Sequence, residues 1–381
     1  MKNPLKLLAI AVLFSCSENE EKSSSNILEN LKFTVDTVVV DPGDDFLNLS
    51  RGLWPYTLTK DKSQLYFFEI SPFRLVQVDL DQLKVLKKTP FEEEGPNGIG
   101  SYLSGLEIAP NGNLFLKSNA TVGVFDQAAK KLQDLKFVPS GIDSALAENS
   151  SALYSRAVYD FETGKIYTQP TFQEAGEYSL FILNPETQSA RSLPIPKMKI
   201  VGDYSGTITI KSGKSIAMYF YSVASFFTFF PGELFVTNSA MSGIYRYNSQ
   251  TEQLEFIDIQ HQTVPNLMDV EIIKNPTKVA QAEENQQKIL EQLNYMELIW
   301  DDSRQMYFRF GEKSFKGANQ GDPVSYEIYL FAYDKDFKVL GETLVEDLKT
   351  PPRSSFFKNG KLWSFVNVDD ELGFAVIDFK F

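Results

Sequence analysis

A unit of four short strands recurs along the chain at intervals of about 50 residues, and this repeat constrains the fold more than any other feature. The clearest copy is Gly105–Phe137, GLEIAPNGNLFLKSNATVGVFDQAAKKLQDLKF. Its first two strands, Leu106–Ala109 and Asn113–Lys117, are joined through Pro110–Gly112, a strong hairpin signal because Asn-Gly tolerates positive φ. Four-stranded units at this period predict an all-β fold, the β-propeller.

The number of units predicts six blades, because first strands begin near residues 53, 105, 155, 206, 295 and 355. The fourth unit has one strand-like segment too many, which we interpret as an extra strand or hairpin around Ala217–Phe230, with its apolar run FYSVASFFTFF as a core strand. An exposed run of this kind would instead form a membrane- or partner-facing patch. A seven-bladed ring with this unit split is the alternative. Lys278–Leu293, rich in Ala, Glu, Gln and Lys, predicts one inserted surface helix.

The two ends of the chain predict how the ring closes. The last unit has only three strands, Ser355–Phe357, Lys361–Asn367 and Gly373–Phe381, whereas Phe33–Val40 (FTVDTVVV) is a strand without a hairpin of its own. An open ring would expose two apolar blade faces. We therefore expect Phe33–Val40 to complete the sixth blade as its outer strand.

The first residues predict a targeting signal and not a part of the folded domain. Residues 1–15 form a basic start followed by Leu7–Phe14, an apolar run too short to span a bilayer. Leu-Phe-Ser-Cys then ends at Cys16, the only cysteine of the chain, and looks like a bacterial lipobox. We predict a signal peptide at 1–15, a lipidated Cys16 with a flexible tether at 16–30, and the propeller domain at 31–381.

Charge and residue content exclude several function classes. The net charge of −13 repels phosphate backbones, so we expect no nucleic-acid partner. His261 is the only histidine, lies in the polar link Gln260–Gln262 and is predicted to be a loop residue. There is no Gly-x-Ser-x-Gly elbow and no Cys/His set for zinc. We therefore predict a protein that is not an enzyme and carries neither a cofactor nor a metal.

Carboxylate clusters leave calcium as the one ion to consider, because it prefers oxygen ligands. The candidate clusters are Asp41 with Asp44 and Asp45, Asp301 with Asp302, and Asp369 with Asp370. None has the spacing of a calcium loop, and Asp is favoured at turns in any case. Turn chemistry is the preferred interpretation.

The starts of the first strands of a propeller surround one mouth of its central channel. Residues predicted there are Arg51, Trp54, Tyr102, Arg156, Tyr204, Tyr295 and Arg353. Arginine forks and aromatic faces would suit an anionic or sugar-like ligand. In the alternative, these arginines pair with carboxylates of the blades and the aromatic rings pack between blades.

The lipobox at Leu13–Cys16, the repeats across Phe33–Phe381 and the segment Tyr295–Phe310 (YMELIWDDSRQMYFRF) together resemble a family of uncharacterised Bacteroidetes lipoproteins with a predicted six-bladed propeller. The resemblance supplies no activity and no catalytic residues. It implies an outer-membrane lipoprotein, palmitoylated and facing the periplasm or the cell surface. We predict a binding or scaffold protein that presents its channel mouth to a small molecule, a glycan or a protein. A calcium-assisted hydrolase or lactonase with channel carboxylates is the alternative.

Overall fold

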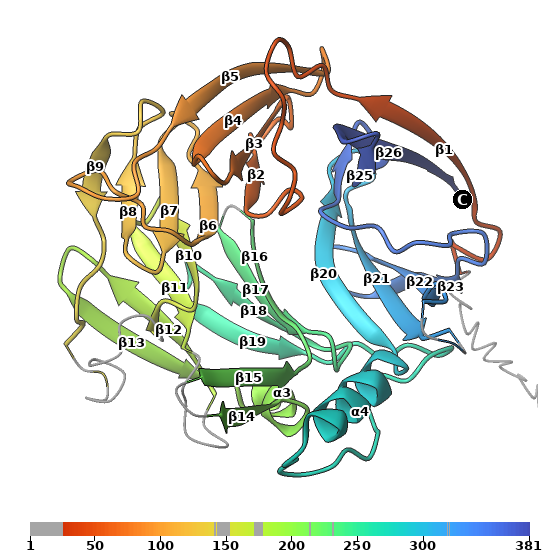
Figure 1. Ribbon diagram of the computed structural model, residues 1–381. Coiled ribbons are helices and arrows are strands. Elements are labelled where there is room, and N and C mark those ends of the chain that lie inside the picture. The colour runs from red at the N-terminus through yellow and green to blue at the C-terminus, as the bar shows by residue number, and fades with distance from the viewer. Residues whose placement is uncertain are drawn as a thin grey trace, which may run out of the picture.

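The computed structural model describes residues 26–140, 142, 153–170, 178–212, 215–230, 232–317, 319 and 321–381. These residues form six four-stranded antiparallel sheets, the blades, arranged in a ring, together with one separate two-stranded hairpin (Figure 1). The predicted six-bladed propeller is therefore confirmed, and the seven-bladed alternative is not what forms.

The four strands of each blade are named from the ring axis outward. Blade 1 is β2 (Tyr56–Leu58), β3 (Gln64–Glu69), β4 (Arg74–Asp79) and β5 (Lys84–Pro90). Blade 2 is β6 (Leu103–Ile108), β7 (Leu114–Ser118), β8 (Val122–Phe125) and β9 (Lys131–Asp134). Blade 3 is β10 (Arg156–Asp160), β11 (Lys165–Gln169), β12 (Ser179–Asn184) and β13 (Ser189–Pro194).

The second half of the ring continues in the same way. Blade 4 is β16 (Ser225–Phe230), β17 (Glu233–Asn238), β18 (Ile244–Asn248) and β19 (Gln253–Ile257). Blade 5 is β20 (Asn294–Asp301), β21 (Met306–Phe315), β22 (Ser325–Tyr333) and β23 (Val339–Leu344). Blade 6 is β24 (Phe356–Lys358), β25 (Lys361–Val368), β26 (Glu371–Lys380) and, from the other end of the chain, β1 (Lys32–Val39).

The ring closes through β1, as the sequence predicts. β1 pairs antiparallel with β26 along its whole length, from Lys32 opposite Lys380 to Val39 opposite Gly373. In Figure 1 the red N-terminal strand lies beside the dark blue C-terminal one. Phe33 adds an edge contact to Phe379, with ring centroids 6.0 Å apart. The prediction that Phe33–Val40 completes the sixth blade is confirmed.

The fourth blade differs from the sequence interpretation. Its inner strand is β16, not the segment that begins at Gly206, so the predicted start near residue 206 is wrong. The earlier segment forms a separate hairpin of β14 (Gly206–Ser212) and β15 (Ser215–Tyr221), after η1 (Pro196–Met198) and α3 (Lys199–Asp203). Both segments read as strands, and only packing against neighbouring blades decides which one lies near the axis.

The predicted inserted helix is α4 (Val279–Leu290), which lies outside the ring beside the hairpin (Figure 1). Ala282 and Ile289 are buried in one cluster with Ile208 and Tyr221 of the hairpin. At the helix start, the Gln281 side chain accepts the backbone N–H of Lys278 at 3.1 Å. Among the described helices, none has the length and apolar character that crossing a membrane requires.

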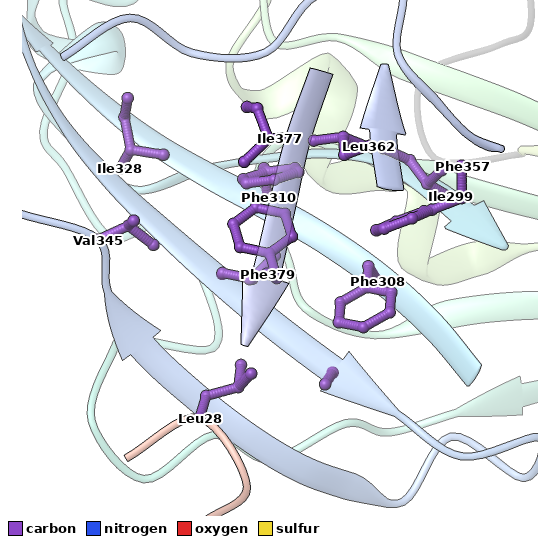
Figure 2. Close-up of a cluster of buried hydrophobic side chains, with 12 residues drawn as sticks. Leu28, Ile299, Phe308, Phe310, Ile328, Val345, Phe357, Leu362, Ile377 and Phe379 are labelled. Carbon is purple, nitrogen blue, oxygen red and sulfur yellow. The ribbon is translucent and has the colours of Figure 1, made fainter. Parts of the chain in front are cut away.

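The apolar core consists of separate clusters, most of them shared by neighbouring blades. Figure 2 shows the cluster between blades 5 and 6, where Phe308 and Phe310 of β21 face Leu362 of β25 and Phe379 of β26. Leu28, just before β1, is fully buried in the same cluster. Each blade therefore shelters its apolar faces against the next one, which is the reason for the closed ring.

In the segment Tyr295–Phe310, an ion pair between Asp301 and Arg304 connects blade 5 to blade 6. Asp301 is buried and accepts the Arg304 guanidinium at 2.6 Å and the Ser303 N–H at 2.9 Å. Arg304 also donates to the carbonyl oxygens of Gly360 and Phe379 in blade 6. These contacts give Asp301 and Arg304 a structural role.

Candidate functional site

The ring encloses an axial cavity of about 2190 Å³. Its wall is formed by the inner strands β2, β6, β10, β16 and β20 and by residues 354–357 at the start of blade 6. Pockets for drug-sized ligands usually measure about 300–1,000 Å³, so this larger cavity can hold a small molecule together with water.

Two cations lie together on the wall between blades 2 and 3. Lys117 of β7 stands opposite Gly105 of β6, where a Cβ atom would lie 3.0 Å from Lys117 Cβ. The missing side chain lets Lys117 pass across the inner strand, and its Nζ donates to the Ser155 carbonyl at 2.6 Å. The next residue, Arg156, starts β10 and also lines the cavity.

Neither cation has a carboxylate partner among the described residues, since the ion pairs found there involve other side chains. Burial, and next the charge of Arg156, lower the pKa of Lys117 to about 8. Burial also lowers the pKa of Arg156, although a guanidinium keeps its proton in proteins. At neutral pH this wall therefore presents positive charge that no described carboxylate pairs with.

An aromatic pair stands at the rim of the cavity. The Trp54 and Tyr102 rings lie 5.8 Å apart and remain 41% and 50% exposed. The Arg51 guanidinium stacks on both, 4.7 Å from the Trp54 centroid and 4.8 Å from that of Tyr102. This arrangement holds two flat, accessible rings where a ligand would enter.

Two acidic residues of the cavity wall, Glu107 and Glu297, are held toward their neutral form. Burial raises the pKa of Glu107 to about 8, although its carboxylate accepts the backbone N–H of Tyr159 at 3.1 and 3.2 Å. Glu297 is accessible to the cavity but closely surrounded by protein, and this desolvation raises its pKa as well. At neutral pH Glu107 is mostly uncharged and does not cancel the cations.

The inner strand of the next blade, β16, forms an apolar wall beside these cations. β16 brings Phe226 and Phe230 to the cavity, on the strand that the sequence placed in the core. The hydroxyl oxygens of Ser225 and Thr228 on the same strand are buried and have no hydrogen-bond partner in the described part of the chain. The cavity thus combines a cationic wall with an apolar wall that carries unused hydroxyl groups.

The structure brings together only part of the seven predicted ligand residues. Trp54, Tyr102 and Arg156 line the axial cavity, and Arg51 stacks against the first two. Tyr295 and Arg353 line a smaller neighbouring cavity of about 320 Å³. Their roles in ligand binding stay a prediction.

The remaining candidates are engaged in contacts of their own. Arg353 pairs with Glu312 at 2.8 Å, and the buried Tyr295 donates to the Pro265 carbonyl at 2.8 Å. Tyr204 lines neither cavity, because the hairpin separates it from blade 4, and its hydroxyl donates to the Met268 carbonyl at 3.1 Å. The sequence reasoning missed Lys117 and Glu107, for which Gly105 inside a predicted strand region was the only local signal.

His261 lies in an irregular segment, as predicted, but it is buried despite its polar neighbours. It is 6% exposed, and its Nδ1 and Nε2 lie 3.0 and 2.9 Å from the hydroxyl oxygens of Tyr295 and Tyr333. Its ring stacks on Phe331 at 4.2 Å. Burial lowers the pKa of His261 to about 3, so its side chain is neutral. Its hydrogen bonds connect the segment after blade 4 to blade 5.

Arg309 has a similar structural role. This arginine is fully buried and donates to the carbonyl oxygens of Asn238, Ser242 and Met296 at 2.9, 2.7 and 2.7 Å. The three carbonyl groups belong to blades 4 and 5, so the guanidinium links neighbouring blades.

The acidic clusters considered for calcium make turn and ion-pair contacts. Asp45 accepts Arg74 at 2.6 Å and Lys88 at 3.1 Å, and Asp302 accepts Lys62 at 2.6 Å. Asp370 lies in the positive-φ turn between β25 and β26. Within the described residue ranges, no three His, Cys, Asp or Glu side chains are grouped as metal ligands would be.

The fold and this cavity define the protein as a six-bladed β-propeller with a cationic patch on its channel wall. Residues 24–344 match the family described as "Domain of unknown function (DUF4221)", and the chain belongs to that family. The predicted family is thereby confirmed, whereas Cys16 and the rest of the predicted lipoprotein signal lie outside the described residues.

Two solved structures are similar to this chain. A DUF4221 member from Bacteroides vulgatus is 14% identical, with a TM-score of 0.65 over 92% of this chain and 98% of that chain. A putative exported protein from Bacteroides fragilis is 10% identical, with a TM-score of 0.48 over 92% of this chain and 96% of that chain. No curated protein matches the chain significantly. The first similarity supports the fold and carries no information on a ligand.

Proposed function

We propose that this chain is a membrane-anchored extracytoplasmic binding protein that takes a small organic anion into its axial cavity. The observation that carries the proposal is the pair Lys117 and Arg156, two adjacent, partly or fully buried cations without a described carboxylate partner. Desolvating two like charges side by side costs folding free energy, and a bound anion would offset that cost.

The surroundings indicate what the anion carries besides its charge. A carboxylate or phosphate group would accept forked hydrogen bonds from Arg156 and a further one from Lys117. The exposed rings of Trp54 and Tyr102 offer a stacking surface, and Phe226 offers an apolar one. An organic anion with an aromatic, sugar-like or apolar body fits this combination better than a bare inorganic ion.

Calorimetric titration with a panel of organic carboxylates and phosphates tests the binding. Replacing Arg156 by glutamine should lower the affinity for the best ligand by roughly 10–100-fold, the effect of losing hydrogen bonds from a charged donor. The matched control is Arg191→Gln, which removes the same charge from an exposed pair with Glu252 outside the cavity. Equal affinities of the wild type and the Arg156→Gln variant, or the absence of any binder in the panel, would contradict the proposal.

The anchoring part of the proposal rests on the lipobox that ends at Cys16. Palmitate labelling of bacteria that express the full chain should mark the protein, and Cys16→Ser should abolish the label. An unlabelled wild-type protein would contradict the anchor and leave the ligand proposal untouched.

A calcium-assisted hydrolase or lactonase stays the alternative. It would need ionised carboxylates on the channel wall, and burial disfavours that form for both Glu107 and Glu297. A calcium titration separates the two functions, because a site that binds calcium raises the melting temperature with ion concentration. A large calcium-dependent rise would favour the hydrolase.

A further inference from the structure

The hairpin of β14 and β15 stands outside the six blades and presents an apolar row to its surroundings (Figure 1). In the antiparallel register, Phe220 is opposite Thr207 and Met218 is opposite Thr209. Since every second residue of a strand points to the same side, Ile216, Met218 and Phe220 share one face. They are 65%, 55% and 64% exposed.

The opposite face of the hairpin packs against the protein in part, whereas Ile210 and Tyr219 on that face are 38% and 40% exposed. Ile208 and Tyr221, both 5% exposed, lie in one cluster with Ala282 and Ile289 of α4. A half-buried antiparallel hairpin normally places polar residues on its outer face. Here three large apolar side chains occupy consecutive outward positions of β15, so the outer face has the composition of a contact surface.

The described chain begins close to the segment that supports this hairpin. Asn26 donates its side-chain amide to the Glu342 carbonyl at 2.8 Å on blade 5. The Glu342 carboxylate in turn accepts the N–H groups of Gln262 and Thr263 at 2.9 and 2.7 Å. These two residues belong to the connection from blade 4 to α4, and α4 packs on the hairpin.

The length of the preceding chain limits how far this region can lie from the membrane. Nine residues lie between Cys16 and Asn26, so ten Cα-to-Cα steps connect the two. Fully extended, they span at most about 35 Å. If Cys16 carries lipid, the tether keeps blade 5 and the neighbouring α4 and hairpin close to the bilayer surface.

We propose that the outer face of β15, with Ile216, Met218 and Phe220, inserts into the interfacial layer of the bilayer to which the chain is anchored. Aliphatic and aromatic side chains partition into this layer, and a second contact point strengthens an acyl anchor that is marginal alone. This inference rests on the proposed lipid anchor at Cys16. The hairpin fixes how the propeller is oriented on the membrane, which a flexible tether cannot do.

A fluorescent probe at Met218 tests the contact. Cys16 is the only cysteine, and lipidation consumes its thiol, so Met218→Cys in the lipidated full chain can carry an environment-sensitive fluorophore. The matched control is Leu132→Cys on β9, another exposed apolar position, 48% exposed, on the outer strand of blade 2. Both proteins are bound to vesicles of phosphatidylethanolamine and phosphatidylglycerol that contain a doxyl-labelled lipid.

The expected result is a blue-shifted emission and a several-fold stronger doxyl quenching at position 218 than at position 132. A probe at Phe220→Cys, on the same face, should behave like the one at position 218. Vesicle flotation with equal, weak quenching at all three positions overturns the hairpin contact while the anchor stands. Failure of the wild-type chain to float overturns the anchor and the inference with it.

Discussion

Replacing Lys117 by methionine should stabilise the fold while it weakens ligand binding. The pKa of Lys117 falls from an ordinary 10.5 to about 8 in the folded protein. At about 1.36 kcal/mol per pKa unit, this shift corresponds to about 3 kcal/mol of unfavourable free energy for the protonated amine. Methionine has a similar length and no charge, but it loses the hydrogen bond to the Ser155 carbonyl, which contributes about 1 kcal/mol.

The net expectation at pH 7 is a gain of about 2 kcal/mol in the free energy of unfolding. For a domain of this size, that gain raises the melting temperature by about 3 °C. Urea unfolding measures the free energy, and titration with the best anion measures the loss of affinity. The control is Lys87→Met on β5, an exposed lysine, for which the stability should change by less than about 0.5 kcal/mol.

The stability difference between the wild type and the Lys117→Met variant should depend on pH. Between about pH 8 and pH 10.5, the unfolded chain binds a proton at Lys117 that the folded chain has released. Wild-type stability therefore rises with pH across this window, and the advantage of the methionine variant, full below pH 8, disappears near pH 10.5. A variant that is no more stable at pH 7, or whose advantage stays constant up to pH 10.5, would refute the reasoning.

Two further predictions concern closure and the acidic wall. Deleting Lys32–Val39 removes β1 from blade 6 and should give an aggregating or partly unfolded protein by gel filtration and circular dichroism, whereas an unchanged melting temperature would speak against closure by β1. Glu107→Gln keeps an acceptor for the Tyr159 N–H and should be up to about 3 kcal/mol more stable than the wild type at pH 7. Its advantage should grow from pH 4.5 to about pH 8, because the unfolded carboxyl loses its proton first; denaturation at pH 4 and pH 8 that shows equal differences would exclude this cause.

Most of the fold could be predicted from the sequence, because strands and turns are specified by residues that are close together in the chain. The turn at Pro110–Gly112 needs a residue that tolerates positive φ, and Gly112 has a φ of 86°. Four segments with alternating apolar residues then follow one another in each unit. The unpaired strand at Phe33–Val40 could complete only the last unit, which has three strands of its own. Blade number and closure follow from these local signals.

The fourth blade and the site were decided by neighbours distant in the sequence. Gly206–Tyr221 and Ser225–Phe230 have the same apolar character, yet packing between blades 3 and 5 selects only the second as an inner strand. Lys117 reaches the cavity wall beside Arg156 because Gly105 opens a path to Ser155 of the next blade. The sequence by itself thus determined which segments are strands and how the ring closes. Only the tertiary structure determined which charges are buried, because burial depends on the other blades that surround each side chain.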